Sequence, residues 1–326
     1  MDWVIITGAA GFLGSALASE LTANGWRVGA VDVLGEDARW RNLADVAIAD
    51  YWDRDEFLRV LANGQLATWP RAIVHLGACS STVEKDAGFL MRNNFAYTRE
   101  LARWCLEHGV RFIYASSAAT YGDGAHGYSD ALHHLAQLRP RNAYAFSKHA
   151  FDLWAWQHGA FAGPGAITGL KYFNVYGPNE FHKGEMRSMV LKAYEQIRVA
   201  GSVKLFKSYQ PGIGDGEQTR DFLYVQDASR ITAWFVEHAA AAGIFNVGSG
   251  VARSWNDLAR AVFAALGREP QLDYIEMPES LRGAYQYYTC ADLTRLRAAG
   301  CALVVHSLEE GVAKYVEDLR ARGSDG

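Results

Sequence analysis

Short apolar runs alternate along the first half of the chain with segments in which apolar residues recur every three or four positions. The runs have the character of buried strands, and the second spacing is that of one helix face. Strands that alternate with helices in this way are typical of a parallel sheet built from βαβ units. The predicted strands are Trp3–Thr7, Arg27–Val31, Val46–Ala49, Ala72–Leu76, Phe112–Ser116 and Ile167–Phe173.

The pattern changes after Pro178, where the polar loops become longer. The glycine-rich segment Pro211–Gly216 is predicted to be a loop between two domains, and such loops commonly lie over a ligand. Helical spacing returns at Met186–Val199, Trp255–Leu266 and Glu309–Arg322.

Two unequal domains account for this arrangement, and a chain of 326 residues is long enough for both. We predict an α/β fold in which residues 1–174 form a Rossmann-type doubly wound parallel sheet that binds a dinucleotide. Segments around 222–250, including the helical Ile231–His238, are predicted to return and cover this sheet. Residues 175–326 are predicted to form a smaller, discontinuous, mixed α/β substrate-binding domain.

The first predicted strand leads into a glycine-rich turn, Thr7-Gly-Ala-Ala-Gly-Phe-Leu-Gly14, and then into a helix. Gly8 permits the tight turn, Gly11 lets the backbone approach a pyrophosphate, and Gly14 lets the helix lie close to the strand. The helix N-terminus offers free N–H groups and a positive dipole end to the phosphates. Asp32 ends the second strand, where an acid that binds a ribose is expected. These features predict a dinucleotide cofactor.

A second motif, Tyr144-Ala-Phe-Ser-Lys148, lies in a predicted helix. A spacing of four places the two outer side chains on one face, one turn apart. The ammonium of Lys148 is expected to favour the phenolate and lower the pKa of Tyr144, and it can also bond a nicotinamide ribose. Ser117 ends a strand at the edge where open α/β sheets bind ligands, so it could orient the tyrosine. The three side chains therefore predict a catalytic site.

Composition narrows the class of partners. Half of the residues are hydrophobic, 21% are charged and the net charge is −4, with no basic block to follow a nucleic-acid backbone. The N-terminal apolar run is too short for a signal peptide, and no stretch is long enough to cross a bilayer, so we expect a cytoplasmic protein without a membrane partner. The four cysteines are scattered, so no metal site is expected.

These motifs together resemble the extended branch of the short-chain dehydrogenase/reductase superfamily, the NAD-dependent epimerases and dehydratases. Within that branch the chain resembles the bacterial ADP-L-glycero-D-manno-heptose 6-epimerase family over nearly its whole length. The discriminating segment is His182-Lys-Gly184. The other segments that carry the resemblance are Gly77–Thr82, Tyr114–Gly122, Tyr172–Pro178, Ala291–Thr294 and Leu296–Gly300.

The resemblance implies an isomerase that epimerises C6 of the heptose in ADP-D-glycero-D-manno-heptose, a small nucleotide sugar used for the lipopolysaccharide core. Bound NADP would take hydride from C6 and return it to the opposite face of a transient ketone. Two bases are then needed, and the family's first and second bases match Tyr144 and Lys183. A lysine acts as a base only where burial or nearby positive charge lowers its pKa. The resemblance also implies a homo-oligomer, with a pentamer as one candidate.

The site residues follow from the glycine turn and from this resemblance. The predicted catalytic residues are Tyr144, Lys183, Ser117 and Lys148. The predicted cofactor-binding residues are Gly8, Gly11, Phe12, Leu13, Gly14, Asp32, Val33, Arg39, Arg54, Leu76, Gly77, Ala78, Cys79, Ser80, Asn93, Lys148, Val175 and Lys183. The predicted substrate-binding residues are Ser117, Asn174, Glu185, Lys192, Phe206, Lys207, Ser208, Tyr209, Arg220 and Tyr285.

The form of the cofactor has two opposing indications. Asp32 favours NAD because a carboxylate bonds a 2′-hydroxyl and repels a 2′-phosphate. Arg39, Arg41 and Arg54 follow it, and these cations could hold the phosphate. We predict NADP, with NAD as the alternative.

Two residues and one loop depart from the family's pattern. Leu76 stands where the family often has glutamate, Glu185 stands where a serine is expected, and the loop Ser208–Thr219 is longer than in compact members. An acid near a diphosphate is unfavourable unless it points away or meets a cation. These departures bear on the substrate more than on the chemistry.

Two other functions are compatible with parts of the sequence. One is another nucleotide-sugar epimerase or a dehydratase, although Ala118-Ala119 occupies the place where dehydratases carry Asp-Glu. The other is a dinucleotide-sensing module without catalysis, which the presence of both Tyr144 and Lys148 disfavours.

Overall fold

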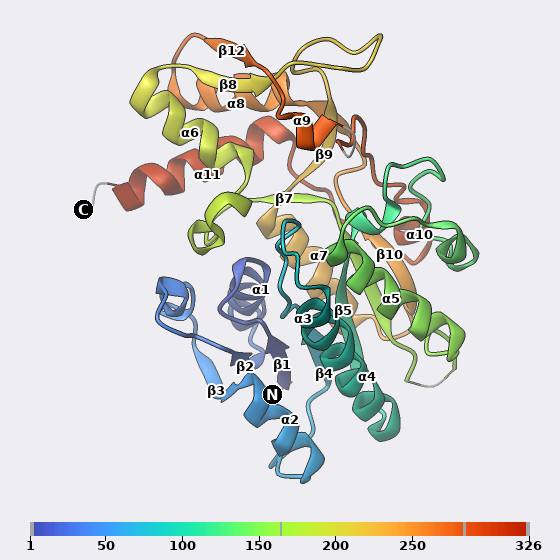
Figure 1. The fold of residues 1–326 in the computed structure, drawn as a ribbon. Coiled ribbons are helices and arrows are strands. Elements are labelled where there is room, and N and C mark those ends of the chain that lie inside the picture. Colours follow the sequence, from blue (N-terminus) through green and yellow to red (C-terminus); the bar gives the residue numbers. More distant parts are fainter. Residues whose placement is uncertain (1–2, 164, 283–284, 324–326) are drawn as a thin grey trace.

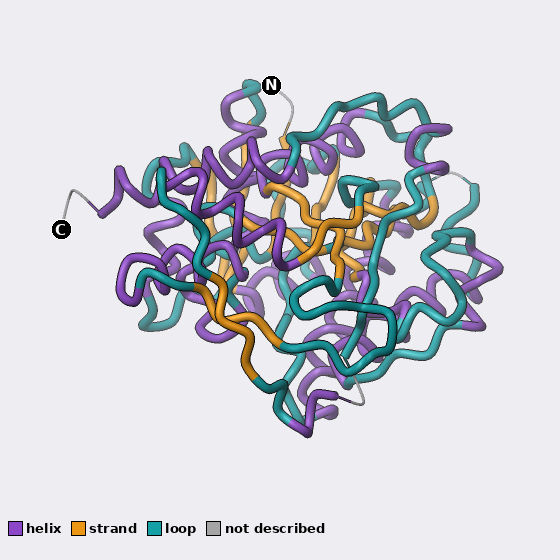
Figure 2. Tube along the Cα trace, turned by 90° about the horizontal axis from the view of Figure 1, so that it is seen from above, coloured by secondary structure: helices purple, strands orange, loops and turns teal. Residues whose placement is uncertain are grey.

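The computed structural model describes residues 3–163, 165–282 and 285–323. It has a lower lobe built on a seven-stranded sheet and a smaller upper lobe of helices and short strands (Figure 1). Seen from above, the strands run through the middle of the molecule with helices around them (Figure 2). Among the described residues, no helix is both long and apolar enough to span a membrane.

The large sheet is parallel throughout and has the strand order β10-β6-β5-β4-β1-β2-β3. This confirms the predicted doubly wound α/β fold. Its strands are β1 (Trp3–Thr7), β2 (Arg27–Asp32), β3 (Ile48–Asp53), β4 (Ala72–His75), β5 (Arg111–Ser117), β6 (Thr168–Tyr172) and β10 (Gly243–Val247).

Helices cover both faces of this sheet, because successive side chains of a strand point to opposite faces. On β1, Val4 and Ile6 pack into the core beneath α1 and α7, whereas Ile5 packs into the core beneath α2, α4 and α5. Each buried strand is therefore apolar on both sides, which explains its continuous apolar run. The helices are α1 (Phe12–Ala23), α2 (Arg54–Ala62), α4 (Tyr97–His108), α5 (Ala143–Gln157) and α7 (Val225–Glu237).

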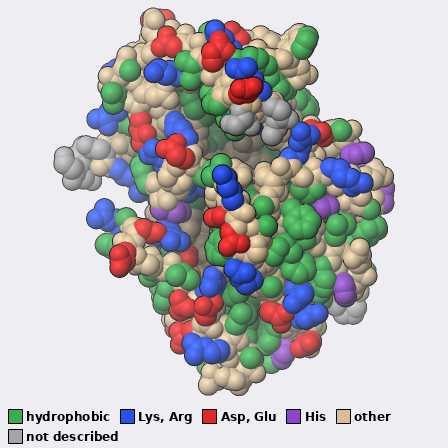
Figure 3. Space-filling model, viewed as in Figure 1, with side chains coloured by type: hydrophobic (Ala, Val, Ile, Leu, Met, Phe, Trp, Pro, Cys, Tyr) green, Lys and Arg blue, Asp and Glu red, His purple; other side chains and the backbone are tan. Residues whose placement is uncertain are grey.

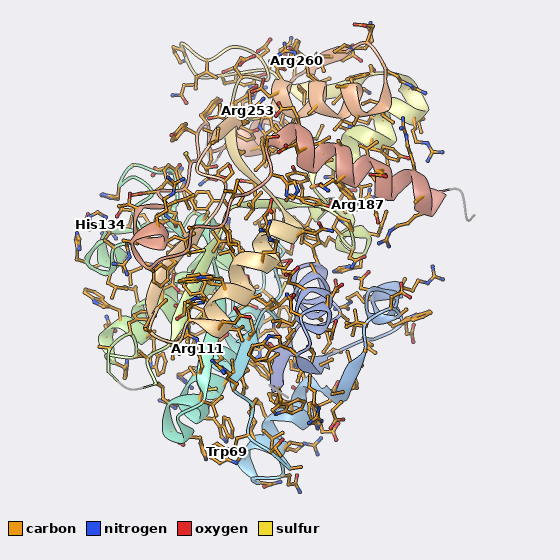
Figure 4. All side chains as sticks on the ribbon, turned by 180° about the vertical axis from the view of Figure 1, so that it is seen from behind. Trp69, Arg111, His134, Arg187, Arg253 and Arg260 are labelled. Atoms are coloured by element: carbon orange, nitrogen blue, oxygen red, sulfur yellow. The ribbon has the colours of Figure 1, made fainter. Side chains whose placement is uncertain are left out.

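A later segment of the chain lies against the large sheet. Helix α7 packs beside α1, and β10 pairs with β6 as the outermost strand. Arg111, labelled in Figure 4, fixes this end of α7 by donating to the carbonyls of Phe235 (2.7 Å) and Ala239 (2.8 Å). Burial of its guanidinium lowers the pKa of Arg111 to about 10.

One strand is displaced from its prediction. The run Val46–Ala49 indicated a strand, but β3 begins at Ile48 because a backbone turn, in which Val46 N–H donates to the carbonyl of Leu43 (3.0 Å), precedes it. β3 is an edge strand whose side chains are largely exposed, so its apolar positions do not mark its limits.

The upper lobe is a layer of helices around a two-stranded sheet. Strands β8 (Val203–Phe206) and β12 (Leu272–Ile275) pair in parallel. Their core is closed by α6 (Met189–Ala200), α8 (Trp255–Leu266) and α11 (Leu308–Gly323). α8 has the predicted limits, because a capping box at Ser254 starts it and left-handed Gly267 ends it.

A three-stranded sheet lies where the lobes meet. It consists of β7 (Asn174–Tyr176), β9 (Thr219–Tyr224) and β11 (Ala252–Ser254), in the order β11-β9-β7. The remaining short elements are η1 (Ala38–Leu43), α3 (Ala87–Leu90), η2 (Met91–Ala96), η3 (Ala118–Tyr121), η4 (Leu132–Gln137), η5 (Phe181–Met186), α9 (Glu279–Arg282) and α10 (Thr294–Ala298).

Candidate active site

One cavity of about 630 Å³ opens at the carboxyl ends of β1, β2, β4 and β5 and extends to residues of the upper lobe. This is the edge at which open parallel sheets bind ligands. On the face shown in Figure 3, acidic and basic side chains are interspersed. Arg187, which lines this cavity, lies between the two lobes (Figure 4).

The glycine turn forms the floor of the cavity. Gly8 has a φ of 70°, and a Cβ at this position would lie 2.5 Å from the backbone nitrogen of Gly77. A Cβ on Gly14 would lie 2.0 Å from the carbonyl oxygen of Gly8, so neither position accepts a side chain. Helix α1 begins after Gly11 without a side-chain cap, and its first N–H groups therefore remain available to an anion. This arrangement fits the pyrophosphate of a dinucleotide.

Asp32 connects the end of β2 to this turn. Its carboxylate accepts the N–H groups of Ala10 (2.8 Å) and Val33 (2.7 Å). Burial raises the pKa of Asp32, while these hydrogen bonds and the nearby Arg39 guanidinium oppose the rise. The acid thus supports the glycine turn in addition to lining the cavity.

The predicted catalytic triplet is brought together on one wall. Ser117 ends β5 and lies near Tyr144 in the first turn of α5. Asn142 caps this helix by accepting the N–H of Ala145 (2.8 Å). Ser117, Tyr144 and Lys148 all line the cavity.

Lys148 has a partner that the sequence did not indicate. Its ammonium donates to the carbonyl of Ala115 (2.7 Å), and burial lowers its pKa to about 8. The expected lowering of the Tyr144 pKa by Lys148 is not what the structure gives. Burial raises the pKa of Tyr144, and the group that opposes the rise is Ser117.

Lys183 reaches the cavity from the upper side. It lies in η5, where Gly184 adopts a φ of 53° that favours glycine and reverses the chain. The Lys183 ammonium lies 4.9 Å from the centroid of the ring of Phe12, a residue of the glycine turn. Burial lowers its pKa and the charge of Glu180 opposes this, so Lys183 has the environment that a lysine base requires.

Most of the predicted cofactor-binding residues line the cavity. They are Gly8, Gly11, Phe12, Leu13, Gly14, Asp32, Arg39, Leu76, Gly77, Ala78, Cys79, Ser80, Lys148, Val175 and Lys183. The other three are not among its described lining residues: Arg54 and Asn93 are hydrogen-bonded to each other (2.7 Å), and the exposed Val33 follows Asp32.

Five of the ten predicted substrate-binding residues line one of two adjoining cavities. Ser117 and Asn174 line the first. A second cavity, of about 830 Å³, shares Arg187, Met189 and Trp255 with the first. Lys192, Phe206 and Tyr285 line this second cavity.

Arg220 is buried next to the second cavity. Its guanidinium lies over the rings of Trp255 (5.5 Å) and Tyr285 (5.2 Å). A cation that is stacked on two rings in this way holds those aromatic side chains in place.

The unexpected acid Glu185 meets a cation. Its side chain is exposed, and Lys192 donates to its carbonyl (2.6 Å) and lies 3.4 Å from its carboxylate. This is one of the two arrangements under which an acid was expected to be tolerated near a diphosphate.

Like Glu185 and Arg220, three further predicted substrate residues lie outside the described linings of both cavities. Lys207 pairs with Glu276 (2.8 Å), and the N–H of Ser208 donates to Asp215 (2.7 Å). Tyr209 hydrogen-bonds Glu276. The loop Pro211–Gly216, expected over a ligand, likewise contributes no described residue to these two linings. The binding role of the three residues stays a prediction.

A buried hydrogen-bond chain beneath the cavity was not predicted. Thr7 bonds one ring nitrogen of His75 (2.5 Å), and Thr98 bonds the other (2.8 Å). Thr98 donates to the carbonyl of Asn94, whose amide donates to Ser147 on α5 (3.0 Å). Asn94 lies in η2, a π-helical turn of a kind that is frequent at functional sites. The sequence shows polar residues at the ends of apolar runs, but this pattern does not indicate which of them bond to one another.

Comparisons with known proteins agree with this site. Residues 4–248 match the NAD dependent epimerase/dehydratase family. The chain is 49% identical over 318 residues to the ADP-L-glycero-D-manno-heptose-6-epimerase of Nitratidesulfovibrio vulgaris, covering 97% of this chain and 98% of that protein. It is 44% identical to the enzyme of the same name from Fusobacterium nucleatum, covering 98% of each.

Solved structures show the same likeness. The crystal structure of Helicobacter pylori ADP-L-glycero-D-manno-heptose-6-epimerase has a TM-score of 0.81 and 27% identity, covering 98% of this chain and 96% of that chain. The UDP-glucose 4-epimerase of Thermus thermophilus, in complex with NAD, has a TM-score of 0.76 and 25% identity, covering 98% and 99%. The chain therefore belongs to the NAD dependent epimerase/dehydratase family, and within it to the ADP-L-glycero-D-manno-heptose-6-epimerases.

Proposed function

We propose that this enzyme converts ADP-D-glycero-D-manno-heptose into ADP-L-glycero-D-manno-heptose, the reaction named by its relatives and used in building the lipopolysaccharide core. The observation that carries the proposal is the meeting of Tyr144 and Lys183, from two different elements, at the cavity that contains the glycine turn. An epimerase needs this arrangement because its two substrates differ in the orientation of one hydroxyl group.

Membership of the family gives the chain a nicotinamide dinucleotide cofactor, which supplies hydride acceptance and return at C6. We propose that the first N–H groups of α1 bind its pyrophosphate and that Asp32 binds a ribose. For the form of the cofactor we propose NADP, with Arg39 as the residue that binds the 2′-phosphate, because Arg39 lines the cavity beside Asp32. NAD remains the alternative.

Within this site each catalytic side chain has a separate task. Ser117, which lies near Tyr144, orients the Tyr144 hydroxyl and offers its own oxygen to the sugar. Tyr144 exchanges a proton with the C6 hydroxyl of one epimer. Lys183, with its lowered pKa, does so for the other epimer. Lys148 supplies a positive charge close to the reacting centre and to the ribose.

The second cavity suits the nucleotide end of the substrate. Arg187 and Lys192 supply cations for a diphosphate, and the rings of Phe206, Tyr285 and Trp255 supply surfaces for a base. A nucleotide sugar that extended from this cavity into the first would bring its sugar toward Tyr144. A homo-oligomer is part of the proposal through the family resemblance alone.

The experiment is incubation of the purified enzyme with ADP-D-glycero-D-manno-heptose and no added cofactor, followed by proton NMR of the products. Formation of the L-glycero epimer supports the substrate, the reaction and a retained cofactor together. The Tyr144→Phe/Lys183→Met double variant is the control and is expected to form none. Failure of the wild-type enzyme, even with added NADP or NAD, would overturn the heptose assignment.

A further inference from the structure

A fully buried ion pair lies behind the catalytic wall. The Asp152 carboxylate on α5 and the Lys171 ammonium on β6 are 3.0 Å apart, and their side chains are 0% and 1% exposed. Burying two charges is costly, and such a pair is often no more stabilising than apolar residues of the same volume. Its presence in this core therefore calls for a role other than stability.

The hydrogen bonds of the pair lead to the end of β5. Asp152 accepts the hydroxyls of Tyr114 (2.8 Å) and Ser116 (2.7 Å). Lys171 donates to the hydroxyl of Thr120 (2.5 Å), and Thr120 donates to the carbonyl of Ser117 (2.7 Å). Both charges are thus bonded to the strand end and turn that carry Ser117.

The ion pair also lies close to Lys148. Asp152 follows Lys148 by one helical turn on α5, and its charge favours the ammonium form of Lys148 against the effect of burial. The ammonium itself is bonded to Ala115, two residues before Ser117. Asp152 is therefore linked to two neighbours of Tyr144. It reaches Ser117 through Lys171 and Thr120, and it acts on Lys148 through its charge.

We propose that Asp152 and Lys171 are positioning residues for the epimerisation. Their pair holds the end of β5 so that the Ser117 hydroxyl stays on Tyr144, and the Asp152 charge keeps Lys148 protonated in a buried place. The first part rests on the proposed function, because it concerns turnover. The second part concerns Lys148 alone and can be measured without substrate.

Two conservative variants separate positioning from packing. Thr120→Val removes the hydroxyl that links Lys171 to the carbonyl of Ser117, and it preserves the shape of the side chain. Tyr114→Phe removes a bond to the other oxygen of the same carboxylate, three residues before Ser117, and leaves the bonds of Ser116 and Thr120 in place. We expect Thr120→Val to lower kcat about tenfold with KM within about twofold of wild type, and Tyr114→Phe to leave kcat within about twofold. Equal loss of kcat in both variants, or none in Thr120→Val, would overturn the first part.

The second test is a titration of Lys148. Removing both charges in Asp152→Asn/Lys171→Met avoids an unpaired buried charge, so this variant is expected to fold. The titratable groups that face Lys148 are His75 on β4, and Tyr144 and Asp152 on its own helix. Burial and the charge of Lys148 keep the pKa of His75 well below its usual value, so His75 is neutral at neutral pH.

The titration is followed by NMR of the holoenzyme with isotope-labelled lysine, with Lys148→Met identifying the signal. We expect Lys148 to lose its proton at a lower pH in the double variant than in wild type. An unchanged titration would overturn the second part, even if the wild-type enzyme proved inactive on ADP-heptose. Inactive wild-type enzyme with a shifted titration would instead count against the proposed function alone.

Discussion

The guanidinium of Arg39 lies 3.9 Å from the carboxylate of Asp32 at the cofactor cavity. Both oxygens of that carboxylate already accept backbone N–H groups, from Ala10 and from Val33. These hydrogen bonds partly neutralise the acid that would repel a 2′-phosphate. Arg39 itself also lines the cavity. We predict that specificity between the two dinucleotides depends on this pair.

Replacing Arg39 by alanine is expected to weaken NADP binding at least about tenfold and NAD binding by less than about threefold, because a charge-assisted bond to the extra phosphate is lost. Binding of each dinucleotide to cofactor-depleted enzyme is measured by calorimetry. Arg41→Ala is the matched control, since that guanidinium lies over the ring of Trp40. Equal weakening of NADP and NAD would contradict the assignment of Arg39.

We expect that removing either base slows the oxidation of one epimer and spares the other. Tyr144→Phe should slow single-turnover oxidation of one epimer by about 10²–10⁴-fold, and Lys183→Met should do so for the other. Cofactor reduction is followed by absorbance after each pure epimer is mixed with the enzyme. Lys314→Met, on the exposed face of α11, is the control. The two-base mechanism fails if Tyr144→Phe abolishes both directions equally and Lys183→Met changes neither.

We predict that Glu185 competes with the substrate for Lys192. Glu185→Ser is therefore expected to lower KM for the nucleotide sugar by about two- to fivefold with kcat unchanged, since an exposed ion pair is worth at most about 1 kcal/mol. The effect should shrink as salt is added, because screening weakens the exposed pair. Steady-state kinetics at low and high salt test this, and a higher KM in the variant would show that Glu185 assists binding.

Asp130 makes stability depend on pH in an unusual direction. Burial raises the pKa of this carboxyl to about 6, against the hydrogen bond from the Asn246 N–H and the charge of Arg295. Its pKa is higher in the folded than in the unfolded protein, so the folded protein binds the proton more tightly between about pH 4 and 6. The contribution of Asp130 to stability therefore falls as pH rises through that window, by at most about 3 kcal/mol.

The test compares thermal midpoints of wild type and Asp130→Asn at pH 4.5 and 7.5. The variant cannot titrate at this position, so its midpoint relative to wild type should be higher at pH 7.5 than at pH 4.5. A difference that does not change with pH would mean that Asp130 keeps its charge throughout.

The large sheet could be predicted because its strands are buried on both faces and appear as continuous apolar runs. β1 and β4 show this, whereas the exposed edge strand β3 does not, and its start was misplaced by two residues. The glycine turn could also be predicted from the sequence, because the close approach of Gly14 to Gly8 leaves no space for a side chain.

The partners of charged side chains were much less predictable. A spacing of four indicated that Tyr144 and Lys148 share a helix face, but the Lys148 ammonium bonds Ala115, which is set by strand and helix packing. Asp152 and Lys171 meet only because Ser116 and Lys171 are neighbours in the register of β5 and β6. No local pattern encodes a register between strands separated by an entire helix.

The position of β10 in the large sheet has a consequence for biosynthesis. β6 ends at Tyr172, but the strand that pairs with its outer edge ends only at Val247. While the intervening segment is being translated, β6 presents unpaired backbone groups, and such an edge is a template for other chains. The growing polypeptide must therefore be shielded during this interval, and a nascent chain interrupted before β10 should aggregate, although its cofactor-binding turn is already complete.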